Sequence, residues 1–251
     1  MARFLVFQQR SDGSFFTEYS AASGPGEGQR ELANLYYPGE AILGLVALYE
    51  VDHQKQWLVA AGKGLAYLAK SRAGQQKAPP DHWALIATAR FLPYYDQSEC
   101  PATRRELQNH TGQVVEAFLG RLSPGKATDP SLDGSVDGEG RTAPTATSLE
   151  ALLAALESAS GTGYPCEIAG TIRDAVYHGI DFLLRAQIQS GPYAGGMPGR
   201  MSGNGSRPAP ADANTAQIRV DFVQHALCVF LRYEKLFPRA DASTPNWGHL
   251  R

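Results

Sequence analysis

The chain has 251 residues, of which 43% are hydrophobic and 19% are charged. This composition provides for a sizeable core and excludes a chain that is disordered as a whole. Lys and Arg (23) nearly balance Asp and Glu (25), which leaves a formal net charge of −2. Because there is no strong positive field, we expect neither a nucleic acid nor a membrane as partner.

Three widely separated cysteines, Cys100, Cys166 and Cys228, lack any Cys-x-x-Cys spacing. The pattern predicts neither a disulfide framework nor a structural zinc site, and we expect no metal or other cofactor. The apolar N-terminal run is too short for a signal peptide, and no run reaches the roughly 18 apolar residues of a membrane span. A cytoplasmic location is the resulting expectation.

Apolar residues at helical spacing predict helices of two alternating kinds, which we call inner and outer. The inner helices are apolar around more of their circumference, and prolines stand near three of their starts, at 38, 80 and 144. In chain order the predicted helices are 38–51 (inner), 55–72 (outer), 80–94 (inner), 102–122 (outer), 143–159 (inner), 166–188 (outer) and 216–236 (inner). Only short stretches such as 14–19 resemble strands.

A degenerate repeat marks the outer helices. Phe4-Leu5 is followed by Gln9, Gly13 and Phe15, and Phe182-Leu183 is followed at the same spacing by Gln187, Gly191 and Tyr193. Weaker copies stand at Tyr67-Leu68 and Phe118-Leu119. Alternating helices in sequential hairpins predict an all-α fold, an α/α toroid or an arc of about four hairpins, over a single domain 1–251. A simple helical solenoid is the alternative.

The glutamine–aromatic repeat resembles that of terpenoid-cyclase-type α/α toroids. The stretches YYPGEAILGLVALYE, DHWALIAT and IRVDFVQHAL also resemble proteins related to six-hairpin glycosidases and uronyl epimerases. The resemblance implies the toroid fold and a carbohydrate-active enzyme. The acidic motifs of terpene cyclisation are absent from this sequence.

In such a toroid the inner helices run the same way, so their N-terminal ends would meet at one mouth. Carboxylates, histidines and aromatic rings together suit proton transfer on a sugar. The predicted catalytic residues are Asp221, His225, Asp81, Glu40 and Glu150. The predicted substrate-binding residues are Tyr37, His82, Trp83, Thr147, Arg219 and Gln224, with Tyr36 and Thr145 beside them.

Asp221 and His225 are the first choice because their i, i+4 spacing places them on one helix face. Val220, Phe222, Leu227 and neighbouring apolar residues predict that this pair is buried, with shifted pKa values. Arg219 beside them could bind a substrate carboxylate.

Each of these residues also has a purely structural interpretation. Glu40 could be an acid in a first helical turn, and Asp81 an N-cap. Glu150 stands three residues after Thr147, the spacing of a capping box. Asp221 and His225 could only stabilise their helix, and Arg219 could be a solvated surface residue.

The predicted function is therefore a glycoside hydrolase, lyase or epimerase acting on a small molecule or oligosaccharide. The alternatives are a terpenoid-cyclase-like biosynthetic enzyme and a non-catalytic binding or assembly module, which could form a homodimer. A metal-dependent enzyme would use Asp81, His82, Asp221 and His225. The Gly-rich loop 191–216 could cover the mouth as a lid.

Overall fold

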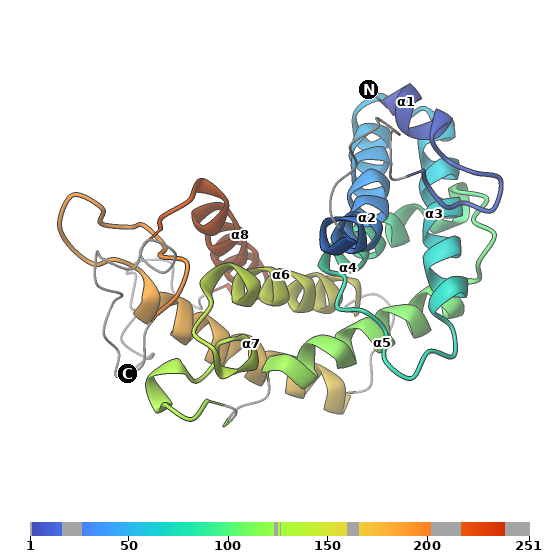
Figure 1. Cartoon of the computed structure of the whole chain (residues 1–251). Helices are drawn as coiled ribbons and strands as arrows, with labels where there is room; N and C mark the ends of the chain where they lie inside the picture. Colours follow the sequence, from blue (N-terminus) through green and yellow to red (C-terminus); the bar gives the residue numbers. More distant parts are fainter. Residues whose placement is uncertain are drawn as a thin grey trace. The chain divides into compact units, whose positions relative to one another are not determined.

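A computed structural model describes residues 2–16, 27–122, 125, 127–159, 166–201 and 217–238. Within these ranges the chain is all-α, as predicted, and β-structure is limited to isolated bridges (Figure 1). The α-helices are α1 (Ala2–Phe7), α2 (Glu27–Asp52), α3 (Lys55–Arg72), α4 (His82–Phe91), α5 (Arg104–Leu122), α6 (Thr142–Ala159), α7 (Cys166–Ala186) and α8 (Val220–Leu236). None of these described helices is long and apolar enough to cross a membrane.

The seven predicted helices are all present. The predicted helix 55–72 coincides with α3, and α6 begins one residue before the prediction. The segment 80–94 is divided between α4 and a 3-10 helix, η1 (Leu92–Gln97). Two further 3-10 turns, η2 (Pro130–Leu132) and η3 (Val136–Gly138), lie in the loop before α6.

The prediction that Pro38 begins a helix is wrong. Helix α2 begins at Glu27, and Pro38 lies inside it. The ring of proline fixes φ at a value that a helix accepts, so a helix can continue through the residue with the loss of one hydrogen bond. Tyr36, Tyr37 and Glu40 therefore lie in the middle of α2 rather than at its N-terminus.

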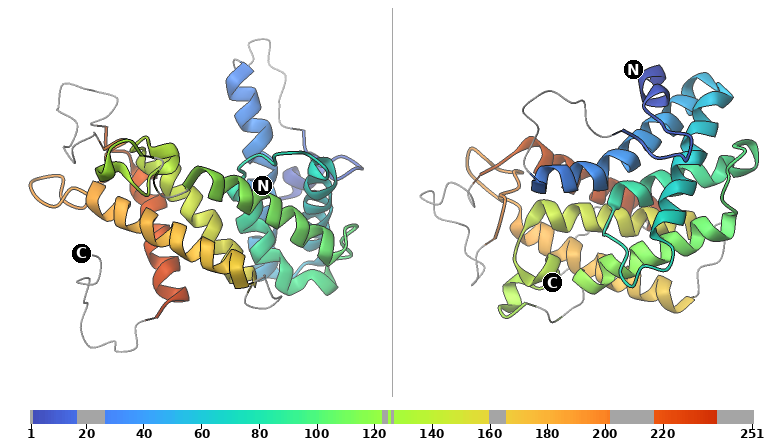
Figure 2. Two further views of the ribbon diagram at one scale, coloured as in Figure 1. Left: turned by 90° about the horizontal axis from the view of Figure 1, so that it is seen from below. Right: turned by 45° about the vertical axis from the view of Figure 1, so that its right-hand side comes forward.

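The chain divides into two compact units: Met1–Ala117 with Ser158–Thr162, and Phe118–Glu157 with Gly163–Arg251. In the first unit α2 packs against α3 and α4 (Figure 2). Ile42 and Leu45 of α2, Leu58 and Leu65 of α3, and Phe91 of α4 are fully buried in this core. The prediction of a single toroid domain stays a prediction.

Glycines allow the helices of each unit to approach closely. A Cβ on Gly64 of α3 would lie 2.7 Å from the side chain of Ile42 in α2. In the second unit a Cβ on Gly179 of α7 would lie 2.6 Å from Leu149 in α6. Gly64 and Gly179 stand three residues before Tyr67 and Phe182, so this glycine belongs to the repeat that predicted the outer helices.

In each unit an Asp-Gly-Ser turn lies across one of the predicted outer helices, α3 in the first unit and α7 in the second. Gly13 (φ 94°) lies over the carbonyl of Lys63 in α3, to which its Cβ would come within 2.2 Å. Gly134 (φ 85°) lies over the carbonyl of His178 in α7, at 2.1 Å. The tripeptide recurs at 12–14 and 133–135, and only glycine suits this combination of positive φ and close approach.

The glutamines of the repeat, Gln9 and Gln187, donate hydrogen bonds to main-chain carbonyl oxygens of the segments that follow their helices. Gln9 Nε2 donates to the carbonyl oxygens of Gly13 (3.2 Å) and Ala60 (2.9 Å). Gln187 Nε2 donates to the carbonyl oxygen of Gly195 at 3.2 Å. These contacts give the glutamines of the repeat a structural role.

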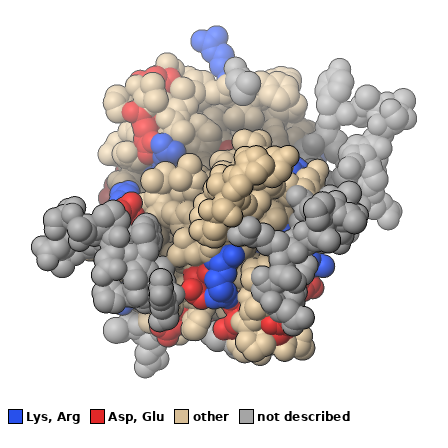
Figure 3. Space-filling model, turned by 90° about the vertical axis from the view of Figure 1, so that its left-hand side faces the viewer, with Lys and Arg blue, Asp and Glu red and all other residues tan. Residues whose placement is uncertain are grey.

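Charged side chains of both signs lie next to each other on the face drawn in Figure 3. The ion pairs of the described residues have the same character, as with Arg90–Glu50 and Lys55–Glu99 in the first unit. In the second unit Arg121 forms two hydrogen bonds with Asp137, and Arg141 pairs with Glu139.

Candidate functional site

Apart from Asp81, five of the predicted site residues lie in the first unit, on two helices that touch. Tyr36, Tyr37 and Glu40 come from α2, and His82 and Trp83 from the first turn of α4. The two helices touch here, because a Cβ on Gly39 would lie 2.7 Å from the Cβ of Trp83. The ring of His82 lies edge-on to Tyr36 (5.2 Å between centroids) and tilted against Trp83 (4.6 Å).

Asp81 has the structural role that the sequence offered as its alternative. It is the N-cap of α4, and its Oδ1 accepts a hydrogen bond from the backbone N–H of Ala84 at 3.0 Å. Its Oδ2 accepts from the guanidinium of Arg72 at 2.8 Å, and the side chain is fully buried. Burial raises the pKa of the Asp81 carboxyl, against the opposing effect of Arg72. A substrate could not touch this carboxylate directly.

Arg72 extends the buried network to His110 of α5. Its Nη1 lies 3.3 Å from His110 Nε2, and both side chains are buried. Since a guanidinium can only donate, Nε2 of His110 accepts, and the hydrogen of the neutral ring is on Nδ1. Burial, aided by the charge of Arg72, lowers the pKa of His110 to about 3.

Glu40 is the accessible carboxylate beside the start of α4. Its side chain is exposed at the surface, yet partial burial and the nearby charge of Asp81 raise its pKa. A raised carboxyl pKa in an aromatic environment is the property that a general acid needs. Tyr37, one turn away, is half-buried, and burial raises the pKa of its phenol.

The second unit contains a carboxylate–histidine pair that the sequence did not predict as a pair. His225 Nδ1 of α8 lies 3.0 Å from Glu150 Oε1 of α6. The side chains are only 15% and 6% exposed. Arg232 of α8 donates to the main-chain oxygen of Glu150 (3.2 Å), so a second contact joins the two helices here.

The prediction that both members of the Asp221–His225 pair are buried is wrong for Asp221. The side chain of Asp221 is 39% exposed, and Val220 beside it is 85% exposed. Asp221 accepts a hydrogen bond from Arg219 at 2.8 Å, and this bond lowers the pKa of the Asp221 carboxyl. The reason is that α8 turns Ala226 and Val229 inward, and 221 lies near the edge of that buried face.

The remaining predicted residues lie close to this pair in the chain. Arg219 precedes α8 and stacks over the ring of Phe222, 5.2 Å from its centroid. Gln224 is exposed beside Cys228. Thr147 Oγ1 donates to the carbonyl oxygen of Pro144 at 3.1 Å, and because α6 begins at Thr142, no capping box joins it to Glu150. Thr145 Oγ1 accepts from the backbone N–H of Val136 (2.9 Å).

The structure thus forms two groups from the predicted residues, one within each unit. The first contains Tyr36, Glu40, His82 and Trp83, whereas the ring of Tyr37 lies against Phe15 (6.1 Å between centroids). The second contains Glu150 and His225. Most of the predicted lid, 202–216, lies outside the described residues, as do 17–26 and 239–251.

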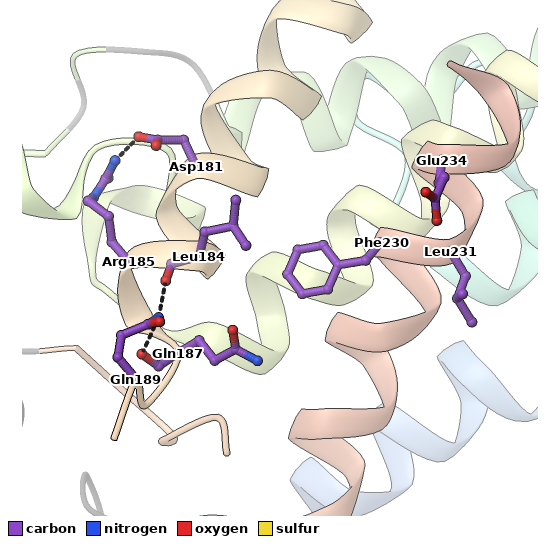
Figure 4. Close-up of a pocket in the computed structure, with 8 residues that line it drawn as sticks. All are labelled: Asp181, Leu184, Arg185, Gln187, Gln189, Phe230, Leu231 and Glu234. Carbon is purple, nitrogen blue, oxygen red and sulfur yellow. Dashed lines mark hydrogen bonds and ion pairs between the residues drawn. The ribbon is translucent and has the colours of Figure 1, made fainter. Parts of the chain in front are cut away.

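A pocket of about 590 Å³ lies in the second unit between the C-terminal parts of α7 and α8 (Figure 4). Phe230 points from α8 toward Leu184 of α7, and the Asp181–Arg185 ion pair lies at its edge. None of the predicted site residues lines it. Among the described residues no group of three or more His, Cys, Asp or Glu side chains could hold a metal ion.

Comparison with known proteins finds no matching family model, no matching characterised protein and no matching solved structure.

Proposed function

We propose that this protein is an enzyme that performs general acid–base chemistry on a carbohydrate. His225 is the group that takes and returns the proton, and Glu150 is the group that orients it. The observation that carries the proposal is the 3.0 Å contact between His225 Nδ1 and Glu150 Oε1.

The chemistry follows from the orientation of the imidazole. A carboxylate accepts a hydrogen bond, so it favours the tautomer in which Nδ1 of His225 carries the hydrogen. Nε2 then has the lone pair that a general base needs. When His225 becomes protonated, Glu150 stabilises the imidazolium, as the aspartate does in Ser-His-Asp triads.

The carbohydrate class is supported by the other side chains and by the sequence resemblance. Glu40, with its raised pKa, and the rings of Tyr36 and Trp83 form an accessible group of the kind that binds and protonates sugars. The finer fold that we propose is an arc of an α/α toroid. Its support is the alternation of the two helix kinds and the recurrence of the glycine contacts at Gly64 and Gly179.

The experiment is a screen of the full-length protein against neutral and uronate-containing oligosaccharides. New reducing ends report hydrolysis, ultraviolet absorbance reports elimination, and NMR reports epimerisation. For the reaction detected, His225→Ala should lower kcat/KM by roughly 10²–10⁴-fold, the usual contribution of a general acid–base group. Glu150→Gln should lower kcat more than it raises KM.

The matched control is His178→Ala. His178 is in the same unit and faces another carboxylate, Asp133, at 3.8 Å, but its side chain is 42% exposed. This variant should keep wild-type kcat/KM. Full activity of the His225→Ala variant would exclude the site, and Glu40→Gln would then show whether the first unit holds the acid.

A binding or assembly module is the second candidate function. The observation that favours it is the apolar surface of α8, where Val220, Leu227 and Leu231 are all more than half exposed. This function predicts no turnover of any saccharide, together with self-association in sedimentation experiments that Leu227→Glu weakens. Turnover abolished by His225→Ala contradicts it.

A further inference from the structure

A second pocket, of about 500 Å³, lies in the first unit between the end of α3 and the first half of α5. Its volume is within the range of small-molecule sites, about 300–1,000 Å³. It contains neither Glu40 nor the aromatic group of α2 and α4, and none of the residues predicted from the sequence lines it.

The α5 wall of this pocket is rich in unused hydrogen-bonding groups. Asn109, Gln113 and Glu116 line it at spacings of four and three residues, so they share one helix face. Within the described chain neither carboxamide has a hydrogen-bond partner. Each carboxamide offers two donor hydrogens and one acceptor oxygen.

His110 adds a donor of known orientation to this wall. Because its Nε2 accepts from Arg72, its hydrogen is on Nδ1, and the lowered pKa keeps the ring neutral at neutral pH. His110 lines the pocket although its side chain is almost fully buried. Its orientation is therefore set by the protein rather than by the ligand.

The described lining of the pocket carries one cation, Lys70 of α3, and two carboxylates, Glu106 and Glu116 of α5. Lys70 donates to the carbonyl oxygen of Pro101 (3.2 Å), and Glu106 already accepts hydrogen bonds from the backbone N–H and hydroxyl of Thr103. Apart from the imidazole of His110, no aromatic ring is among the described residues that line the pocket, so a ligand would be recognised mainly by hydrogen bonds rather than by stacking. The donors and acceptors of these lining side chains suit a small molecule that carries several hydroxyl groups.

We propose that this pocket binds a neutral polyhydroxylated small molecule, of the size of a monosaccharide or a cyclic polyol. Asn109 and Gln113 would each bond a hydroxyl as donor and acceptor, and His110 Nδ1–H would donate to a third. The site does not depend on the Glu150–His225 pair, and it is a binding site rather than a catalytic one.

A glycine in the wall provides a sharp test. Gly112 lines the pocket, and a Cβ built on it would meet no atom within 4 Å. Gly112→Leu therefore adds an apolar side chain to the pocket wall at a position where its Cβ meets no other atom, and leucine favours the helix more than glycine does. Gly120→Leu is the matched control, because Gly120 is in the same helix, has the same open space and does not line the pocket.

The experiment titrates the full-length protein with D-glucose, D-galactose and myo-inositol and follows backbone amides by NMR. At least one of these probes should shift the amides of Gly74, Asn109, Gly112 and Gln113 at millimolar concentration. Gly112→Leu should abolish the shifts, and Asn109→Ala should weaken binding about tenfold, the effect of one lost hydrogen bond of about 1.4 kcal/mol. Gly120→Leu should leave the affinity unchanged.

Two results would overturn the proposal. One is the absence of shifts at the pocket with all three probes. The other is an affinity that Gly112→Leu leaves unchanged, which would place the ligand elsewhere on the molecule.

Discussion

At the scale of single residues, the buried Arg72–Asp81–His110 network has the clearest energetic consequence. Asp81 must remain paired because an isolated buried carboxylate is costly, and Arg72 supplies both the charge and the hydrogen bond. His110 accepts the second N–H group of Arg72 and cannot take up a proton without losing that contact. The network thus fixes the protonation state of a histidine in the core.

The pH dependence of stability follows from the depressed pKa of His110, about 3 in the folded protein. The unfolded chain takes up a proton at this histidine near pH 6.5, whereas the folded chain does not. The stabilisation is therefore complete above pH 6.5 and is lost as the pH falls toward 3. Between about pH 7.5 and about pH 5 this one group should reduce the unfolding free energy by about 2 kcal/mol.

The variant His110→Gln isolates this contribution. Glutamine keeps an acceptor for Arg72 but does not titrate, so urea unfolding should show a smaller loss of stability at low pH than in the wild type. Asp81 and Glu40, whose pKa values are raised, contribute with the opposite sign in both proteins and cancel in the difference. Parallel stability curves for the two proteins would contradict the protonation state assigned to His110.

At the scale of elements, the Asp-Gly-Ser turns show how one residue positions a loop on a helix. Gly134 and Gly195 have the same φ of 85°, but a Cβ would meet an atom within 4 Å only at Gly134, where it would strike the carbonyl of His178. Gly195→Ala should cost about 1 kcal/mol from the left-handed backbone alone. Gly134→Ala should cost about 1–3 kcal/mol more, because the loop must move off α7.

Thermal or urea unfolding of the two variants checks this expectation. Equal losses of stability would mean that the loop moves freely and that the contact with α7 does not hold it. A larger loss in Gly134→Ala would show that the turn and the helix fold as one element.

Helix positions could be predicted because the signals are local. The apolar spacing in 55–72 and 143–159 depends on neighbouring turns of one helix, and both helices lie where it indicates. The start of α2 could not be predicted from the sequence. Pro38 resembles the proline of a first helical turn, but it also fits a helix interior when the surrounding turns are stable. The repeated Asp-Gly-Ser tripeptide was a usable signal for a second turn.

For the molecule as a whole, the sequence allowed single site residues to be predicted, but not which of them are partners across different helices. Within the first unit, the contact of Gly39 in α2 with Trp83 brings Glu40 near the start of α4, although Glu40 lies in the middle of its helix and not at the predicted N-terminus. The partner of His225 was predicted as Asp221, four residues away, but it is Glu150, 75 residues away in the chain. Local spacing favours helix neighbours, and only the packing of α6 against α8 reveals a more distant partner.

The proposed function requires that Glu150 orients the imidazole of His225 as a general base. The tautomer of His225 is the most direct test of this requirement. A long-range ¹H–¹⁵N NMR spectrum of the full-length protein distinguishes a hydrogen on Nδ1 from one on Nε2. If the Glu150 carboxylate orients His225, the neutral ring is in the Nδ1–H form. A neutral ring with its hydrogen on Nε2 would exclude this role, since Glu150 would then face a lone pair and could not orient a base.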